Sequence, residues 1–168
     1  MIKIKSYDYA GLIKSYLVQD RKYAKTAGDR MSYSGVYLHS YDSVLAKLNT
    51  EHKIIYIDSD IAHYSNTSIK HATILRTRAR NSFIVFKIPI DGTVEDIVTH
   101  YTDIISIAIT NHTRARAEHS KRYWKSQIFN TFDELTLYLD LHLRKNSKYR
   151  RVLQPIFQQL FELKLLKD

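Results

Sequence analysis

The chain has 168 residues, and its 26 Lys and Arg against 17 Asp and Glu give a formal net charge of +9. The length suits one domain, residues 1–168, and the hydrophobic fraction of 44% excludes a disordered chain. Because the chain has no cysteine, disulfides and thiolate sites are excluded, and the cytoplasm is expected. No apolar run suits a secretory signal or a membrane span, so neither is expected.

The N-terminal segment alternates between strand-like and helix-like patterns. Ile2 and Ile4, separated by one lysine, predict a short first strand. Apolar residues at helical spacing from Tyr9 to Ala24 predict an amphipathic helix. The segment from Lys25 to Ser34 is small, polar or charged and contains Gly28, so a mobile connection is expected there.

The next segment predicts short strands around one helix. Three β-like runs follow in order, namely Gly35–His39, Ser43–Leu48 and Lys53–Ile57. The polar residues Asn49–His52 are turn-like, so the last two runs form an antiparallel hairpin. A helix is expected from Thr67 to Asn81, with Thr67 or Ser68 capping its first amide groups. The run Phe83–Ile88 then predicts a central, buried strand.

The C-terminal half changes to helical spacing. A capping arrangement at Thr93 predicts a long helix that carries apolar residues as far as Ala108. Thr131–Glu134 predicts a capping box that opens a second helix, and a third follows Ser147, where Pro155 must start, bend or interrupt it. The predicted fold is therefore α+β, with a small, mainly antiparallel sheet packed against several helices and a helical C-terminal half.

The positive charge gathers in three clusters along the chain. The residues expected to contact phosphates are Arg76, Arg78, Arg80, Arg114, Arg116, Lys121, Arg122, Lys125, Arg150 and Arg151. If residues 112–125 continue as one helix, Arg114, Lys121 and Lys125 share one side of it. Such a surface matches the repeating charge of a nucleic-acid backbone, although a net positive charge can also serve solubility alone.

Tyrosine is abundant, with 13 copies, and some of them lie inside the basic clusters. Tyr123 and Trp124 follow Arg122, while Tyr149 precedes Arg150. Aromatic faces among cations stack on unpaired bases, so single-stranded DNA or RNA is a plausible ligand and Tyr123 is a candidate contact. Aromatic residues at helical spacing also pack in cores, and both interpretations stay open.

Two histidines occur in the form His-x-Thr, as His71-Ala-Thr73 and His100-Tyr-Thr102. The pair is similar to the signature of the two-histidine phosphoesterases. That resemblance implies that the imidazoles act as general acid and base and that the threonines bind phosphate, with both motifs on neighbouring strands. In this chain both copies lie in segments of helical spacing. Phosphodiesterase or nuclease activity is therefore kept as an alternative to binding.

Asp58 and Asp60 directly follow an apolar run, with His63 close behind. Two carboxylates on the same side of a strand end can hold a magnesium ion for phosphoryl chemistry. Aspartates after a strand are also common turn formers. The chain has no P-loop, dinucleotide-binding glycine pattern, HExxH helix or zinc-ligand pair, so no cofactor is expected.

One stretch resembles a pattern in small uncharacterised phage and plasmid proteins, in which a Ser-Tyr hairpin precedes Tyr-Ser-x-Thr-Thr-x-x-His. The matching residues are Ser40–Ala46, Lys53–Tyr56 and Tyr64–His71. This chain has Ser68 where the second threonine of the pattern stands. The resemblance implies an origin in a phage or mobile element, and hence the cytoplasm of a host cell, but it transfers no activity.

These features predict a phage-type accessory protein that binds nucleic acid through a basic helical surface, with host takeover or defence evasion as its setting. Two alternatives stay open, namely an inhibitor that docks on a host protein and a His-dependent phosphodiesterase or nuclease. No membrane partner is expected. The segment from Leu160 to Leu166 either closes the core or supports a homodimer.

Overall fold

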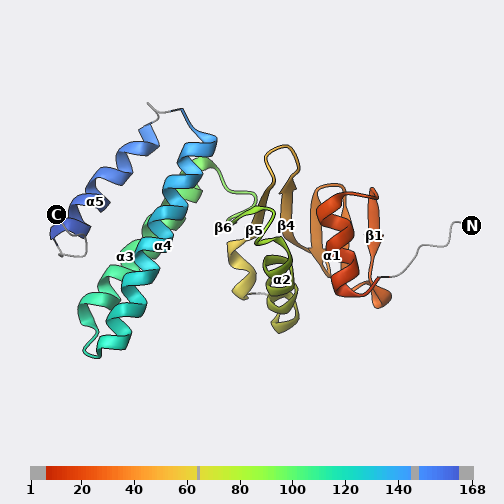
Figure 1. Cartoon of the computed structure of the whole chain (residues 1–168), viewed down its shortest axis with the longest axis horizontal. Helices are drawn as coiled ribbons and strands as arrows, with labels where there is room; N and C mark the ends of the chain where they lie inside the picture. Colours follow the sequence, from red (N-terminus) through yellow and green to blue (C-terminus); the bar gives the residue numbers. More distant parts are fainter. Residues whose placement is uncertain (1–6, 64, 145–147, 163–168) are drawn as a thin grey trace, which may run out of the picture. The chain divides into compact units, whose positions relative to one another are not determined.

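The computed structural model describes residues 7–63, 65–144 and 148–162, and the chain divides into two compact units, Met1–Asp91 and Gly92–Asp168 (Figure 1). The sequence-based expectation of one domain stays a prediction, because compactness alone does not test whether the units fold together. The predicted strand at Ile2 and Ile4 lies outside the described residues. None of the described helices combines the length and the apolar character that a membrane span requires.

The N-terminal unit is built on a six-stranded sheet whose strands lie in chain order. They are β1 (Tyr23–Lys25), β2 (Met31–Ser34), β3 (Tyr37–Ser40), β4 (Ser43–Asn49), β5 (Ile54–Asp58) and β6 (Ile84–Ile88). Neighbours from β1 to β5 pair antiparallel, whereas β6 joins β5 in parallel. A parallel pair needs a crossover connection, which α2 (Asn66–Ala79) supplies. The predicted α+β class with a mainly antiparallel sheet is confirmed.

One face of this sheet holds the core of the N-terminal unit. Two helices, α1 (Tyr9–Val18) and α2, pack against it (Figure 1). Side chains alternate along a strand, so the core residues fall at alternate strand positions, interrupted at a β-bulge between β3 and β4: Ala24, Met31, Tyr33, Leu38, Leu45, Ala46, Leu48, Ile55 and Ile57. The side chains between them face away from α1 and α2.

The predicted helix Tyr9–Ala24 is too long. Helix α1 ends at Val18 because Gln19 takes a left-handed conformation, with φ 53°, and its backbone N–H donates to the carbonyl of Tyr16. The apolar residue that seemed to extend the helix, Ala24, instead belongs to β1 and is buried in the core.

The predicted mobile connection from Lys25 to Ser34 is wrong, because this segment completes β1 and forms the turn η1 (Ala27–Asp29) and all of β2. The Thr26 hydroxyl accepts the backbone N–H of Met31 at 3.1 Å, and Gly28 takes φ 75°, which a residue with a side chain rarely adopts. The turn is thereby fixed. Strand β2 is short, and every second residue in it is a serine, so its composition is similar to that of a loop.

Strands β3, β4 and β5 confirm the three predicted runs to within two residues, and β4 and β5 form the expected antiparallel hairpin. The expectation of a central strand at Phe83–Ile88 is wrong, because β6 lies at the edge of the sheet. Phe86 and Ile88 are buried, whereas Lys87 is exposed. An apolar run predicts that the side chains of a strand are buried. It does not predict whether the strand has a neighbour on both sides.

The C-terminal unit is helical throughout its described part. It contains α3 (Val94–Arg114), α4 (Glu118–His142), the short turn η3 (Lys148–Val152) and α5 (Leu153–Glu162). Helices α3 and α4 pack side by side as a hairpin (Figure 1). The predicted start at Thr93 is confirmed, since its hydroxyl accepts the N–H of Asp96 at 3.2 Å and the Asp96 carboxylate accepts the N–H of Thr93 at 2.8 Å.

Two predicted helix boundaries in this unit are wrong. Residues 112–125 do not form one helix, because Ala115 and Ala117 are extended, with ψ 129° and 135°. Thr131–Glu134 does not open a helix either, because Thr131 is buried in the middle of α4. No residue near the break is a strong helix breaker. The break instead lets α3 and α4 fold back and bury their apolar stripes against each other.

Candidate nucleic-acid interface

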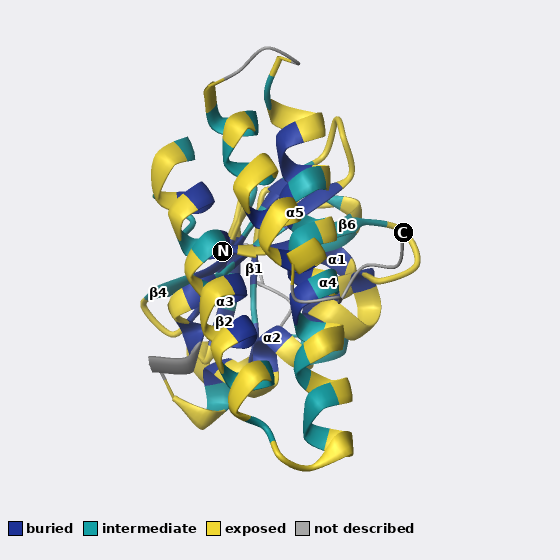
Figure 2. Ribbon diagram, turned by 90° about the vertical axis from the view of Figure 1, so that its left-hand side faces the viewer, coloured by how far each residue is buried: buried dark blue, intermediate teal, exposed yellow. Residues whose placement is uncertain are grey.

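The turn between α3 and α4 carries the densest group of the predicted phosphate contacts. We call it the basic turn, and it comprises Arg114, Arg116, Lys121, Arg122 and Lys125. All of these residues except the half-buried Lys121 are exposed, and Figure 2 shows the turn coloured mainly as exposed. The sequence predicted that these charges line one long helix face. Because the helix breaks here, they gather at one end of the hairpin instead.

Aromatic rings lie within the basic turn. The side chain of Tyr123 is 56% exposed, and its ring meets that of Trp124 edge-on with centroids 4.9 Å apart. An exposed ring beside cations has the chemistry that stacks on an unpaired base. The ion pair between Arg122 and Glu118, at 3.5 Å, joins two exposed side chains, so water screens it and Arg122 stays available to a phosphate.

The predicted cluster of Arg76, Arg78 and Arg80 lies at the C-terminal end of α2, and all three residues are exposed. Arg76 and Arg80 are four residues apart and share one side of the helix, whereas Arg78 points to another side. Cations at this end also stabilise the helix by interacting with its free carbonyl groups. The cluster therefore has two cations on one side of the helix that can each contact a phosphate, and it also stabilises the helix end.

Arg150, from the third cluster, is occupied by contacts within its own unit. Its Nη1 donates to the carboxylate of Asp140 at 2.6 Å, and its Nη2 donates to the carbonyl oxygens of Leu139 at 3.0 Å and Leu143 at 3.3 Å. The guanidinium therefore caps the C-terminal end of α4. Its neighbour Arg151 is exposed and remains a candidate phosphate contact.

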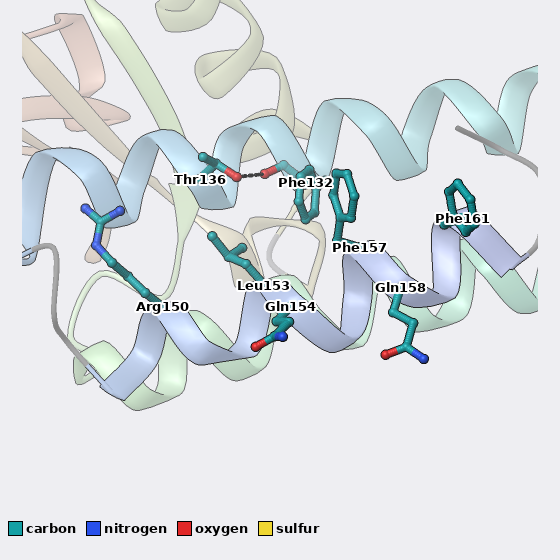
Figure 3. A pocket seen from close by; sticks show the side chains of 8 residues that line it. All are labelled: Phe132, Thr136, Arg150, Leu153, Gln154, Phe157, Gln158 and Phe161. Carbon is teal, nitrogen blue, oxygen red and sulfur yellow. Dashed lines mark hydrogen bonds between the residues drawn. The ribbon is translucent and has the colours of Figure 1, made fainter. Parts of the chain in front are cut away.

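An apolar groove of about 640 Å³ lies between α4 and α5 (Figure 3). Its walls include Phe132 and Phe157, whose ring centroids are 6.5 Å apart, and the exposed Phe161. Glutamines and Thr136 supply most of its polar groups, and Arg150 at one end is engaged by Asp140. Because its lining is mainly apolar, we do not count the groove among the candidate phosphate contacts.

The predicted catalytic histidine His71 lies in a buried serine network in the N-terminal unit. Its Nδ1 is 2.9 Å from the hydroxyl of Ser40, which is also 2.9 Å from the hydroxyl of Ser68. The backbone N–H of Ser68 donates to Ser65, which caps α2 in place of the predicted Thr67 or Ser68. That capping prediction is wrong because the helix begins at Asn66, one residue earlier than expected.

The pair of Ser40 and His71 does not have the access that a catalytic site needs. A hydroxyl at hydrogen-bond distance from an imidazole can act as a nucleophile with its base. Both side chains, however, are only 1% exposed, and the ring of Tyr9 lies 4.6 Å from the imidazole, centroid to centroid. Burial lowers the pKa of His71, which favours the neutral ring in the folded unit. The network joins β3 to α2.

The remaining members of the His-x-Thr pair lie on helices. Thr73 is on α2 and Thr102 is on α3 beside His100. Each threonine hydroxyl donates to a backbone carbonyl of its own helix, at 2.9 Å, so it is engaged locally. The strand setting of the two-histidine phosphoesterases is therefore missing, and the two motifs belong to different units of the chain.

Asp58 and Asp60 lie at the end of β5 and in the turn η2 (Ser59–His63). The carboxylate of Asp58 accepts the backbone N–H of Asp60 at 3.3 Å, which is the contact of a turn-forming aspartate. Within the described ranges, no group of three or more His, Cys, Asp or Glu side chains could hold a metal ion. The contact of Asp58 is thus that of a turn former at the end of β5.

Sequence reasoning missed the face of the sheet that points away from α1 and α2. One row of paired residues there runs from β1 to β5 through Tyr23, Ser34, Tyr37, Lys47 and Tyr56, and it continues in β6 at the buried Phe86. These residues are spread over six strands and look unrelated in the sequence. The alternation within each strand was the available signal, but the row follows only from the register between strands.

No protein-family model, curated protein or solved structure matches the chain. The resemblance to the phage and plasmid pattern therefore stays a prediction.

Proposed function

We propose that this protein binds nucleic acid and that the basic turn between α3 and α4 contacts the phosphate backbone. The observation that carries the proposal is the gathering of five cations at one exposed end of a helix hairpin. A protein that neutralises phosphates releases condensed counterions, so each contact adds affinity that falls with salt. The exposed ring of Tyr123 beside these cations adds a surface for a base.

The charges of the basic turn are not offset by an equal number of acids close by. Glu118 is the acidic residue within the turn, and its ion pair with Arg122 is open to water. Such charges have little reason to gather for stability, since surface ion pairs contribute little and like charges repel. A polyanionic ligand supplies the missing counter-charge. Host takeover or defence evasion remains the setting that we propose for this binding.

The test is a salt series with labelled DNA and RNA, measured by fluorescence anisotropy. The variant Arg114→Gln/Arg116→Gln should lower the slope of log affinity against log salt by about 1.4 to 1.8, because each lost phosphate contact removes about 0.7 to 0.9. The matched control Lys14→Gln/Lys70→Gln removes two exposed charges from α1 and α2 and should leave the slope unchanged.

Three outcomes would overturn the proposal. One is the absence of a complex with any DNA or RNA, and another is a complex whose affinity does not change with salt. The third is an equal effect of the variant and its control, which would place the contacts elsewhere. Capture from a bacterial lysate adds a further arm, since a partner protein that survives nuclease treatment would favour the alternative of docking on a host protein.

A further inference from the structure

The row that crosses the outer face of the sheet follows from the register of the strand pairs from β1 to β5. Tyr23 pairs with Ser34, Ser34 with Tyr37, Tyr37 with Lys47, and Lys47 with Tyr56. Directly paired residues point to the same face of a sheet. Each member of the row is adjacent in its own strand to at least one residue of the core, so the row faces away from α1 and α2.

The row is open to solvent over its first strands. The side chains of Tyr23 and Tyr37 are 47% and 38% exposed, and Ser34 between them is exposed as well. Lys47 and Tyr56 are half-buried. The two large rings are separated by a small serine and are partly exposed, whereas the tyrosines of the inner face, such as Tyr33, are fully buried.

A cation lies against this aromatic surface. The Nζ of Lys47 is 5.6 Å from the centroid of the Tyr37 ring, within the range of a cation–π contact. Lys25, two residues along β1 from Tyr23, points to the same face but is paired with Asp29 at 2.8 Å. Residues 1–91 contain fourteen Lys and Arg against eight Asp and Glu, so this unit carries most of the excess positive charge.

We propose that this open sheet face binds the unpaired bases of single-stranded nucleic acid. Tyr23 and Tyr37 each stack on one base, and Lys47 neutralises a phosphate beside Tyr37. The two rings project from strands that are two apart, about 10 Å from each other, so each meets a separate base. A duplex keeps its bases paired and stacked, and this flat face has no element that enters a groove.

The inference rests on the proposed function and narrows it to a class of ligand. The basic turn supplies phosphate contacts that a duplex and a single strand share. The sheet face supplies stacking, which needs bases without partners. The two surfaces use different residues in different units, so separate variants can remove one without the other.

The experiment compares Tyr23→Leu/Tyr37→Leu with Tyr23→Phe/Tyr37→Phe. Leucine keeps an apolar side chain but has no ring, whereas phenylalanine keeps the ring and removes the hydroxyl. The probes are a labelled oligo(dT), a labelled oligo(U) and a labelled DNA duplex. We expect the leucine variant to bind both single strands about tenfold more weakly or worse, with the phenylalanine variant close to the unchanged protein. Affinity for the duplex should be the same in all three proteins.

Each other result has a defined meaning. If the unchanged protein binds none of the probes, the proposed function fails and the inference falls with it. If the unchanged protein binds but the leucine variant binds equally well, the inference alone is overturned. The same holds if the leucine variant loses affinity for the duplex and for the single strands equally. Melting temperatures of both variants must match that of the unchanged protein, and a Tyr37→Leu single variant is the substitute if the double variant unfolds.

Discussion

The buried imidazole of His71 should make the stability of the N-terminal unit depend on pH. Its Nδ1 contacts the Ser40 hydroxyl, and its other close neighbour is the ring of Tyr9, so its closest contacts are uncharged. Burial lowers the pKa of His71 below the ordinary value of 6.5. The folded state therefore binds this proton less readily than the unfolded state does.

The sign and size of the effect follow from this difference in proton binding. Between the ordinary pKa of 6.5 and the lower pKa of the folded state, the unfolded chain holds the proton and the folded chain does not. The contribution of His71 to the free energy of unfolding therefore has its full value above about pH 6.5. It falls as the pH is lowered, by at most about 1.4 kcal/mol per pH unit. Below the pKa of the folded state the loss stops.

The assay is urea unfolding followed by far-UV circular dichroism, at constant ionic strength and a series of pH values. The comparison is His71→Asn, because the asparagine amide can reach Ser40 much as Nδ1 does but does not titrate. This variant should be less stable at neutral pH, since it lacks the ring that contacts Tyr9. The stability gap between the two proteins should narrow as the pH falls below 6.5, because only the histidine protein loses stability at this site.

Parallel stability curves for the two proteins would refute the reasoning. An NMR titration of the His71 ring gives an independent check, and an ordinary pKa in the folded protein would contradict its burial. The seven other histidines are present in both proteins, so their titration cancels in the comparison.

Two further predictions concern helix ends in the C-terminal unit. Arg150→Ala should lower the free energy of urea unfolding by about 1 to 3 kcal/mol, since it removes the guanidinium that donates to the carbonyl oxygens of Leu139 and Leu143 and pairs with Asp140. Arg150→Lys should recover only part of the loss, because an ammonium group cannot reproduce the planar fork. Thr93→Ala should cost about 1 kcal/mol by thermal or urea unfolding, because it removes the cap of α3, while Thr93→Ser should be nearly neutral.

Local patterns predicted the elements whose signals are contained in a few neighbouring residues. The hairpin of β4 and β5 and the start of α3 at Thr93 are of this kind, since a turn or a capping box specifies each one. The break between α3 and α4 is a failure of another kind, because it depends on partners far along the chain. Ala115 and Ala117 are ordinary helix formers, and only the pairing of α3 with α4 explains the break between them.

The candidate site residues also differ in how far the sequence could predict them. Exposure of the basic turn could be anticipated from its charge, because unpaired cations remain in water. Arg150 could not be separated from Arg151 in the sequence, since its role depends on the position of Asp140 and the end of α4. The row of Tyr23 and Tyr37 depends on the register of β1, β2 and β3, which no single strand reveals.

From the strand order we also expect a particular order of folding. Strands β1 to β5 each pair with the next strand along the chain, so their contacts close short loops and can form early. Strand β6 must wait until the whole of α2 has been made, because its parallel partner β5 lies on the far side of that crossover. During synthesis, the meander up to Asp58 would emerge with the edge of β5 still unpaired, a stage at which intermolecular strand pairing is the main hazard.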